Sequence, residues 1–499
     1  MTGAKTARLL AALACSLVAS PTIADDAVPR FEPAECWFAK PAGAVDCGFL
    51  VVPANRRKAD GKTVRVAVAT FRTTLGVQYP DPVVIVGGGP GYPIGLTDEG
   101  LVEWRKQIRR TPAFQQRNVI LVEQRGVGRS EPSLNCDEID AVGASTEYLL
   151  ADGNTSGKDD IAAMVACSDR LLRDGVDLAG YSGIEFAADL ADLRRAIGYD
   201  AWNLVGTSYG SRIALTVMRD HPEGLRAVVL NSVYPLEAQF LENYWGTAAR
   251  MLNLAFAACE DNDACRKEYP DIAAHYFDTV ARMNEKPATA EVPRAEGGQT
   301  MELPVSGWMV GEVTLDLLAS SDWMTTIAYV DAVSAGDAHM IEVTAKYIVG
   351  KYADAEQFSD GVYYSAICQE EFPFDDATAV RADYGAYGRL LGVDWQDAEE
   401  EICHAWPVAS APASENAAVS SDIPTLLLAG TWDYITPPEY ADAVHQRLPN
   451  SYLIMFPKVG HDVISTNYCG LLVVDEFLNH PDRKPSSWCA LYPIEPGFK

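Results

Sequence analysis

The feature that most constrains the fold is a series of short, wholly apolar runs that alternate with segments of helical periodicity. Such runs are typical of strands buried on both faces, because a strand with one face in water alternates apolar and polar residues. The helical segments between them supply the crossovers that parallel strands need. The sequence therefore predicts an α/β fold, in which helices cover both faces of a parallel sheet. The apolar runs are residues 83–86, 119–122, 202–205, 227–230, 425–428 and 452–455.

The alternation stops within one long stretch that is rich in Ala, Met, Trp and Tyr and has a mostly helical pattern. Because apolar runs resume after it, we interpret this stretch as an insertion that caps a single sheet. The predicted organisation is an export signal at 1–24, a first core segment at 25–235, a helical cap at 236–415, and a second core segment with a C-terminal tail at 416–499.

Gly206-Thr-Ser208-Tyr-Gly210 is the one G-x-S-x-G pattern in the chain, and it joins an apolar run to a helical segment. In that setting the serine lies on a sharp, strained turn, and the glycines two residues away relieve the crowding. Its hydroxyl is exposed at the end of the strand, with the positive end of a helix behind it. We predict that Ser208 is a nucleophile. A glycine-rich turn without chemistry is the alternative.

A serine hydroxyl needs a base to accept its proton, and the base needs an acid to orient it. Where the serine lies on a strand–helix turn of this kind, the acid and then the histidine follow it along the chain. Asp433 stands just past the apolar run at 425–428, and His461 follows a glycine past the run at 452–455. We predict that His461 is the base and Asp433 is its acid.

Three other residues compete for these two roles. His445 lies within an amphipathic helical pattern, and His480 lies beside a proline in a polar tail. Neither position is as well suited to reach the serine as a loop that directly follows a strand. Asp462 is the main rival of Asp433, although a residue adjacent to the histidine generally points away from it.

The loop after the first apolar run reads Gly87-Gly-Gly-Pro-Gly91. Attack by serine creates a negative oxygen that needs hydrogen-bond donors, and glycines let the backbone approach it closely. We predict that the backbone N–H groups of Gly88 and Gly89, together with that of Tyr209, form this oxyanion hole. A plain turn is the alternative, and a phosphate loop is disfavoured because no Gly-Lys-Ser/Thr sequence follows.

The first 24 residues have the pattern of an export signal. Lys5 and Arg8 precede an apolar run at 9–19, and small residues lead to a cleavage site after Ala24. Loss of these two positive charges would change the formal charge from −29 to −31. A lipoprotein anchored through Cys15 is a weaker alternative, because no clear leucine stands three residues before it.

Eleven cysteines are present, and ten remain once the signal is removed. An even number in an exported chain favours disulfides over free thiols, although the sequence alone does not fix their connectivity. A zinc site is disfavoured because there is no C-x-x-C and the seven histidines are scattered, so we expect no metal and no cofactor. Pairing of neighbours along the chain gives Cys36–Cys47, Cys136–Cys167, Cys259–Cys265, Cys368–Cys403 and Cys469–Cys489.

Lys and Arg number 40 against 69 Asp and Glu, which gives the formal charge of −29. Such a surface repels phosphate backbones, so we expect no nucleic-acid partner. No further apolar stretch reaches about 18 residues, so we also expect no membrane span. The oligomeric state is left open.

Taken together, the motifs resemble those of the tripeptidyl aminopeptidase and proline iminopeptidase group of serine peptidases. The matching stretches are 87–91, 123–130 (Glu-Gln-Arg-Gly-Val-Gly-Arg-Ser), 206–212, 430–437 and 460–461, spread over both core segments. The chain departs from the group at Gly87, where histidine is common, and at Glu123, where aspartate is common. These departures bear on substrate preference more than on the predicted triad.

The resemblance implies an α/β-hydrolase fold and hydrolysis of an amide or ester at the N-terminal end of a peptide. The helical cap is expected to limit substrates to short peptides or small esters, and the export signal predicts a location in the periplasm or outside the cell. Such an exopeptidase must recognise a free α-ammonium group, which calls for carboxylates near the acyl site. The cap contains Cys368-Gln-Glu370-Glu371-Phe-Pro-Phe374. We predict that Glu370 or Glu371 binds the substrate amine; a solvated acidic turn is the alternative.

Two other functions compete with the exopeptidase. One is a carboxylesterase that acts on small esters with the same triad. The other is a non-catalytic binding protein of hydrolase fold, which the presence of serine, acid and histidine together disfavours.

Overall fold

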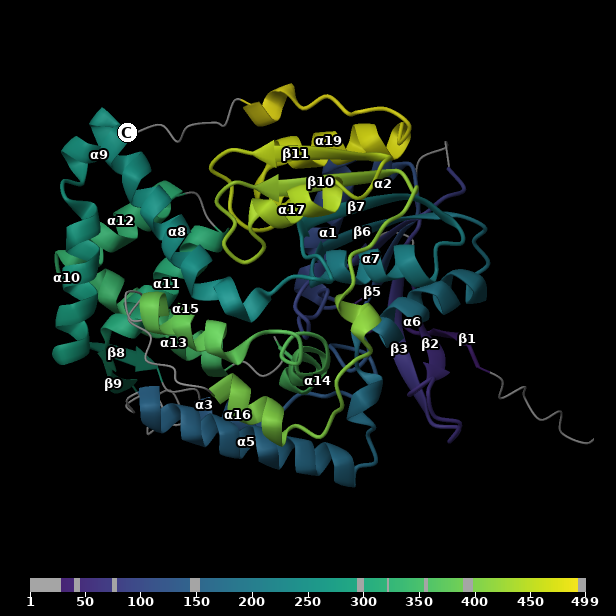
Figure 1. Ribbon diagram of the computed structural model, residues 1–499, viewed down its shortest axis with the longest axis horizontal. Helices are drawn as coiled ribbons and strands as arrows, with labels where there is room; N and C mark the ends of the chain where they lie inside the picture. Colours follow the sequence, from purple (N-terminus) through teal and green to yellow (C-terminus); the bar gives the residue numbers. More distant parts are fainter. Residues whose placement is uncertain are drawn as a thin grey trace, which may run out of the picture.

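The computed structural model describes residues 28–39, 45–73, 79–143, 153–293, 300–320, 323–353, 358–388 and 398–491. Its centre is a nine-stranded sheet with the strand order β1-β2-β3-β5-β4-β6-β7-β10-β11 (Figure 1). The strands are β1 (Arg30–Ala34), β2 (Val45–Pro53), β3 (Thr63–Phe71), β4 (Val83–Val86), β5 (Val119–Val122), β6 (Trp202–Ser208), β7 (Leu225–Val233), β10 (Thr425–Gly430) and β11 (Ser451–Phe456).

The six strands from β5 to β11 in this order pair in parallel, and each predicted apolar run lies within one of them. Every residue of β4, β5 and β10 is buried, as expected for strands covered on both faces. The first three strands are different: β1, β2 and β3 pair antiparallel, and so do β3 and β5. The sheet is therefore mixed. The short connection between β2 and β3 favours a hairpin, in which the two strands are antiparallel.

Helices cover both faces of the sheet. On one face, α6 (Gly183–Ala196), α7 (Tyr209–Asp220) and α17 (Pro438–His445) bury apolar side chains in a core shared with the strands. On the other face, α1 (Asp98–Arg110), α2 (Pro112–Gln115) and α19 (Tyr468–Asn479) contribute to a separate core. This is the doubly covered arrangement predicted from the apolar runs.

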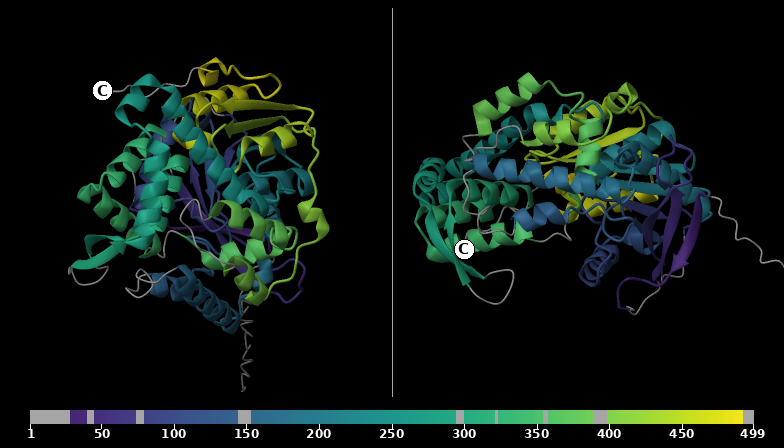
Figure 2. Two further views of the ribbon diagram at one scale, coloured as in Figure 1. Left: turned by 60° about the vertical axis from the view of Figure 1, so that its left-hand side comes forward. Right: turned by 90° about the horizontal axis from the view of Figure 1, so that it is seen from below.

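Between β7 and β10 the chain forms the helices and the hairpin that lie beside the sheet in Figures 1 and 2. Most of these elements share a second hydrophobic core, while α14 (Asp360–Glu370) and α16 (Ala398–Ala405) bury side chains such as Ile367 and Ile402 in the core of the sheet. The domain boundaries given above remain a prediction. The elements are α8 (Phe240–Asp261), α9 (Asp263–Glu268), α10 (Ile272–Glu285), β8 (Ala288–Pro293), β9 (Thr300–Val305), α11 (Gly307–Ser320), α12 (Trp323–Ser334), α13 (Ala338–Ala353), α14 (Asp360–Glu370), α15 (Ala377–Tyr387) and α16 (Ala398–Ala405).

The hairpin of β8 and β9 was not expected in a stretch with a mostly helical pattern. Its two six-residue strands pair antiparallel from Ala288–Val305 to Pro293–Thr300. The buried side chains of Val292, Leu303 and Val305 complete the second core. The strands form because the hairpin covers this core, which outweighs their short length and their prolines.

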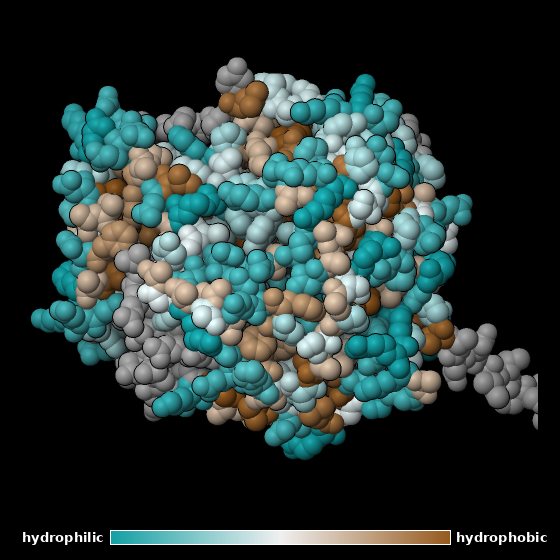
Figure 3. Space-filling model, in the orientation of Figure 1, coloured by the Kyte–Doolittle hydropathy of each residue, from teal (hydrophilic) through white to brown (hydrophobic). Residues whose placement is uncertain are grey.

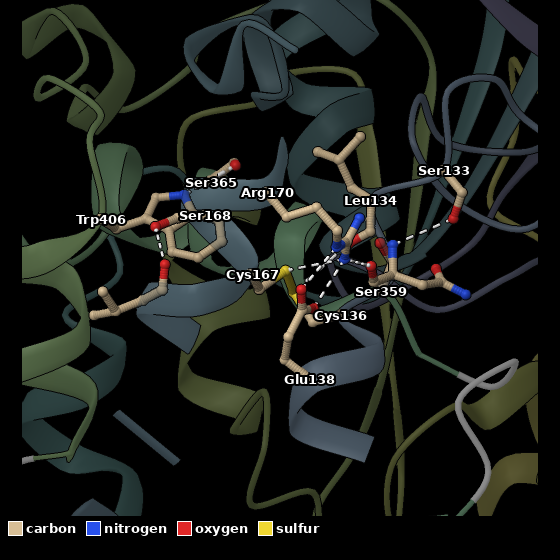
Figure 4. Close-up of a disulfide and its surroundings, with 12 residues drawn as sticks. Ser133, Leu134, Cys136, Glu138, Cys167, Ser168, Arg170, Ser359, Ser365 and Trp406 are labelled. Carbon is tan, nitrogen blue, oxygen red and sulfur yellow. Dashed lines mark hydrogen bonds and ion pairs between the residues drawn. A yellow bond between two sulfur atoms is a disulfide. The ribbon is translucent and has the colours of Figure 1, made fainter. Parts of the chain in front are cut away.

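Among the described cysteines the structure has five disulfides, and they join the five neighbouring pairs predicted from the sequence. Figure 4 shows Cys136–Cys167, which fastens the start of α3 (Asp137–Gly143) to α5 (Gly153–Arg173). Ser359 and Leu134 lie close by, and the Leu134 carbonyl accepts a hydrogen bond from the Gly361 N–H at 3.1 Å. This disulfide therefore supports the segment on which α14 begins.

The face of the molecule in Figure 3 is mostly hydrophilic, with apolar side chains in scattered patches. In the part of the chain that the structure describes, no helix is both long and apolar enough to cross a membrane, and no group of three or more His, Cys, Asp or Glu side chains could hold a metal ion. The predicted export signal and Cys15 lie outside the described residues.

Candidate active site

Ser208 is the last residue of β6 and directly precedes α7. Its backbone has φ 57° and ψ −125°, a region that non-glycine residues rarely adopt and that stores strain at functional sites. The flanking glycines make this turn possible. A Cβ on Gly206 would lie 2.2 Å from the Gly210 carbonyl oxygen, and a Cβ on Gly210 would lie 2.3 Å from the Val86 carbonyl oxygen.

Asp433 and His461 meet after the carboxyl ends of β10 and β11. The Nδ1 atom of His461 lies 2.8 Å from Oδ2 of Asp433, and the Asp433 side chain is fully buried. Thr436 donates from its hydroxyl to the same oxygen at 2.7 Å, and the N–H groups of Ile435 and Thr436 donate to Oδ1 at 2.9 Å each. These hydrogen bonds fix the orientation of the carboxylate toward His461.

The charge of Asp433 also acts on the histidine. Burial by itself lowers the pKa of His461, but the charge of Asp433 and its hydrogen bond outweigh burial, so the pKa lies above the ordinary value of 6.5. This pairing fixes a proton on Nδ1 and turns Nε2 into the acceptor, which is the form that a general base needs.

The loop that carries His461 is held against the cap. The His461 N–H donates to the carbonyl oxygen of Ala319, near the carboxyl end of α11, at 3.1 Å. A Cβ on Gly460 would lie 2.7 Å from the Leu318 carbonyl oxygen, so only glycine permits this close contact with α11.

Asp462 has a different role from the one considered as an alternative to Asp433. Its Oδ1 accepts hydrogen bonds from Asn231 at 2.6 Å and from the Ser465 N–H at 3.2 Å, so it caps α18 (Val463–Thr466). Asn231 in turn donates to the hydroxyl of Thr207 at 3.1 Å. Asp462 therefore ties the histidine loop to the residue that precedes Ser208.

Within the described residues, no hydrogen bond joins the Ser208 hydroxyl to His461. Catalytic hydrogen bonds are often long before substrate binds and tighten in the complex. The structure therefore brings Asp433 and His461 into contact and links their loops to the turn of Ser208 through Asn231.

The loop after β4 approaches the serine closely. A Cβ on Gly88 would lie 3.1 Å from Cβ and 3.5 Å from Oγ of Ser208, so a side chain here would crowd the serine. Gly89 has φ +112°, in the region that favours glycine. Tyr209 begins α7, so its N–H belongs to the unpaired first turn of the helix. The three predicted oxyanion donors thus come from the two backbone segments that flank the serine.

Glu123 lies beneath this loop. It is buried, and its carboxylate accepts a hydrogen bond from the Ile94 N–H at 3.3 Å. Burial raises the pKa of Glu123 to about 8, although hydrogen bonds from Ile94 and Leu96 oppose that rise. Its contacts are with the backbone that follows the glycine loop, which is consistent with a supporting position.

Glu370 and Glu371 end α14 and are 1% and 3% exposed, so the alternative of a solvated acidic turn is wrong. Glu370 accepts hydrogen bonds from the Tyr209 hydroxyl at 2.9 Å and from the Gly183 N–H. The guanidinium of Arg212 lies 3.7 Å from Glu370 and 3.1 Å from Glu371. Burial raises the pKa of Glu371 to about 8, against the opposing charge of Arg212.

Three residues of the site carried no sequence prediction: Thr436, Arg212 and Gln124. Arg212 lies one helical turn past Ser208 in a matching stretch, and Gln124 lies in another. Their place in those stretches was the signal that could have found them. The contacts of Arg212 and Gln124 span more than 30 residues of chain, however, and no local pattern records such distances.

Comparison with known proteins agrees with this architecture. Residues 81–300 match the model of the alpha/beta hydrolase fold family, and residues 389–488 match that of TAP-like proteins. With the sheet topology and the strand–serine–helix turn, these matches identify the chain as an enzyme of the α/β-hydrolase superfamily, a serine hydrolase. The resemblance drawn from the motifs is confirmed.

Several peptidases are similar to it, two of them along most of their length. The serine protease Hip1 of Mycobacterium tuberculosis is 25% identical over 477 residues, which cover 88% of this chain and 85% of that protein. The tripeptidyl aminopeptidase of Streptomyces lividans is 23% identical over 427 residues, which cover 82% of this chain and 76% of that one. The proline iminopeptidase of Xylella fastidiosa is 26% identical over 177 residues, 36% of this chain and 40% of that protein.

Proposed function

We propose that this protein is an exported serine exopeptidase that releases N-terminal residues or short peptides through an acyl-enzyme on Ser208. The observation that carries the proposal is the 2.8 Å contact between His461 and Asp433, on loops that follow strands parallel to the strand of Ser208. The names of the relatives, a serine protease and two aminopeptidases, favour a peptide as substrate.

In the proposed mechanism, His461 takes the proton of Ser208 as its oxygen attacks the substrate carbonyl. Asp433 holds the imidazole in the correct tautomer and stabilises its charged form. The N–H groups of Tyr209 and of Gly88 or Gly89 bind the oxyanion. His461 then protonates the leaving amine, and water repeats the cycle on the acyl-enzyme.

Glu370 or Glu371 is proposed to recognise the substrate α-ammonium group. The Glu370 carboxylate accepts a hydrogen bond from the hydroxyl of Tyr209, the residue that follows Ser208, and the two carboxylates share the single guanidinium of Arg212. A cation bound near Glu371 would lower the pKa of its carboxyl and so favour the ionised form. Burial strengthens such a charge interaction relative to water.

The test compares Glu370→Gln and Glu371→Gln with a matched control, Glu415→Gln. Glu415 is another buried glutamate, and it is paired with Arg219. Substrates are peptidyl arylamides with a free and with an acetylated N-terminus, and p-nitrophenyl butyrate. We expect one of the two variants to raise KM for the free-amine substrate by about tenfold or more, with little change for the others. An equal change for free and blocked substrates would reject amine recognition.

The same substrates separate the exopeptidase from a carboxylesterase. An enzyme that hydrolyses the butyrate but none of the arylamides would be an esterase. Ser208→Ala should lower turnover of every substrate by about 10³-fold or more and abolish labelling by a fluorophosphonate. Unchanged labelling would remove Ser208 as the nucleophile.

Export is supported by the pattern of residues 1–24 and by the five disulfides, which persist in oxidising compartments. We expect the mature protein to begin at Asp25. N-terminal sequencing after expression from the full gene, with cell fractionation, tests this proposal, and a product that keeps residues 1–24 in the cytoplasm would contradict it.

A further inference from the structure

Gln124 is the second residue after β5 and directly follows Glu123. It is buried, with 4% of its surface exposed. Its side-chain amide spans the glycine loop. Nε2 donates to the Gly88 carbonyl oxygen at 2.7 Å, and Oε1 accepts from the Gly91 N–H at 3.4 Å. One amide therefore contacts the loop on both sides of Gly89.

These contacts determine which way the peptide between Gly88 and Gly89 faces. In a trans peptide the C=O and N–H bonds point in opposite directions, so a carbonyl turned toward Gln124 turns the Gly89 N–H away from it. Gly88 is also the residue of this loop that approaches Ser208, because a Cβ added to it would lie 3.5 Å from the serine Oγ. The orientation of this peptide therefore decides whether a donor is available beside the nucleophile.

We propose that Gln124 is a positioning residue, which holds the Gly88–Gly89 peptide so that the Gly89 N–H is presented to the oxyanion formed on Ser208. The inference rests on the proposed serine mechanism and assigns Gly89, rather than Gly88, as the donor of this loop. Without the contact, a peptide between two glycines can rotate at little cost, because no Cβ restricts it. A rotated peptide would turn a carbonyl oxygen toward the developing negative charge.

The rest of the loop is held by other contacts. The Ser359 N–H donates to the Gly91 carbonyl oxygen at 2.9 Å, and its hydroxyl donates to the Gly126 carbonyl oxygen at 3.3 Å. The Ile94 N–H is bound by Glu123. Loss of the Gln124 amide should therefore release one peptide and leave the path of the loop unchanged.

The test uses Gln124→Leu, which removes both hydrogen bonds but keeps most of the volume. The matched control is Gln115→Leu. Gln115 donates to the Arg109 carbonyl oxygen at 2.8 Å, and it lies before β5 begins, at the opposite end of the strand from Gln124. p-Nitrophenyl butyrate serves as substrate, because it reports on the acyl-transfer step whether or not the enzyme prefers peptides.

We expect Gln124→Leu to lower kcat by about 10- to 100-fold and to change KM less than threefold, since removal of an oxyanion donor costs about 10²–10³ in kcat. Affinity for an alkyl trifluoromethyl ketone, which forms a tetrahedral adduct on the serine, should fall in parallel with kcat. A kcat and ketone affinity within twofold of the wild type would overturn the proposal. So would a loss in Gln115→Leu of the same size.

Gln124→Glu keeps the test decisive if the leucine variant folds poorly. A protonated carboxyl can donate to Gly88 and accept from Gly91 as the amide does, whereas a carboxylate has no donor for Gly88. The ratio of variant to wild-type kcat should therefore fall as pH rises. His461 and the buried Glu123 are present in both enzymes, so the ratio reports what the new carboxyl adds, including its effect on the titration of these two groups. A ratio that does not change with pH would count against the assignment.

Failure of this inference differs from failure of the proposed mechanism. If a fluorophosphonate does not label Ser208 in the wild type, the serine mechanism itself is wrong. If the wild type is labelled and hydrolyses the butyrate while Gln124→Leu behaves identically, only the role of Gln124 is rejected.

Discussion

The environment of Asp433 makes Asp433→Asn a sharp test of the triad. Oδ1 of the carboxylate accepts from two backbone N–H groups, of Ile435 and Thr436, while Oδ2 faces His461 and the Thr436 hydroxyl. In the variant, the amide oxygen has to occupy the Oδ1 position, because an NH₂ group there would point its hydrogens at two donors. The NH₂ group is then turned toward His461.

That orientation forces the wrong tautomer on the base. Nδ1 of His461 becomes the acceptor, its proton moves to Nε2, and Nε2 can no longer take the proton of Ser208. The size and shape of the side chain are nearly unchanged, so folding should be little affected. The same tautomer error in a serine protease triad costs about 10⁴ in kcat. We expect a loss of that order here, equivalent to about 5 kcal/mol in the barrier.

The assay measures kcat with p-nitrophenyl butyrate and a free-amine peptidyl arylamide, with the concentration of folded enzyme taken from absorbance. Asp462→Asn is the matched control, since Asp462 neighbours His461 but binds Asn231 and the Ser465 N–H. Its kcat should stay within about tenfold of the wild type. A loss of less than tenfold in Asp433→Asn, or a large loss only in Asp462→Asn, would refute the reasoning and move the acid to residue 462.

Two further predictions follow from the same contacts and from the disulfides. Asp433 raises the pKa of His461 above 6.5, and the base acts in its neutral form. We therefore expect kcat/KM to decline as the pH falls through a value above 6.5. A pH–rate profile whose acidic limb lies below pH 6.5 would contradict this prediction. The Cys368–Cys403 disulfide closes a loop with a sequence separation of 35. Replacing both residues by serine should therefore lower the free energy of unfolding by about 4 kcal/mol, measured by denaturant unfolding. A loss under about 1 kcal/mol would show that other contacts already hold α14 in place.

Much of the fold could be predicted from the sequence because its signals are local. Apolar runs such as 83–86 and 425–428 are strands in the structure, and the strand–serine–helix turn lies where the glycines of residues 206–210 indicate. The antiparallel pairing of the first strands and the β8–β9 hairpin were not predicted. β1, β8 and β9 contain prolines and polar residues, and their pairing depends on cores that are assembled from distant segments.

The candidate site divides in the same way. The two predicted partners Asp433 and His461 are in contact, because strand ends in a parallel sheet gather their loops at one edge. The surroundings of Glu370 could not be predicted, since Arg212, Tyr209 and Gly183 approach it from other elements. Burial of the acidic pair is a property of the folded cap, and an acidic pair in a sequence usually indicates a solvated surface.

The hydrogen bond from the His461 N–H to Ala319 joins the base to a helix of the cap. A cap that opened by lifting α11 away from the sheet would pull on the imidazole and disassemble the catalytic pair at the moment of substrate entry. Under the proposed mechanism, a substitution on α11 that displaces Ala319 would therefore lower turnover by moving His461, even if the substituted side chain lies far from the serine.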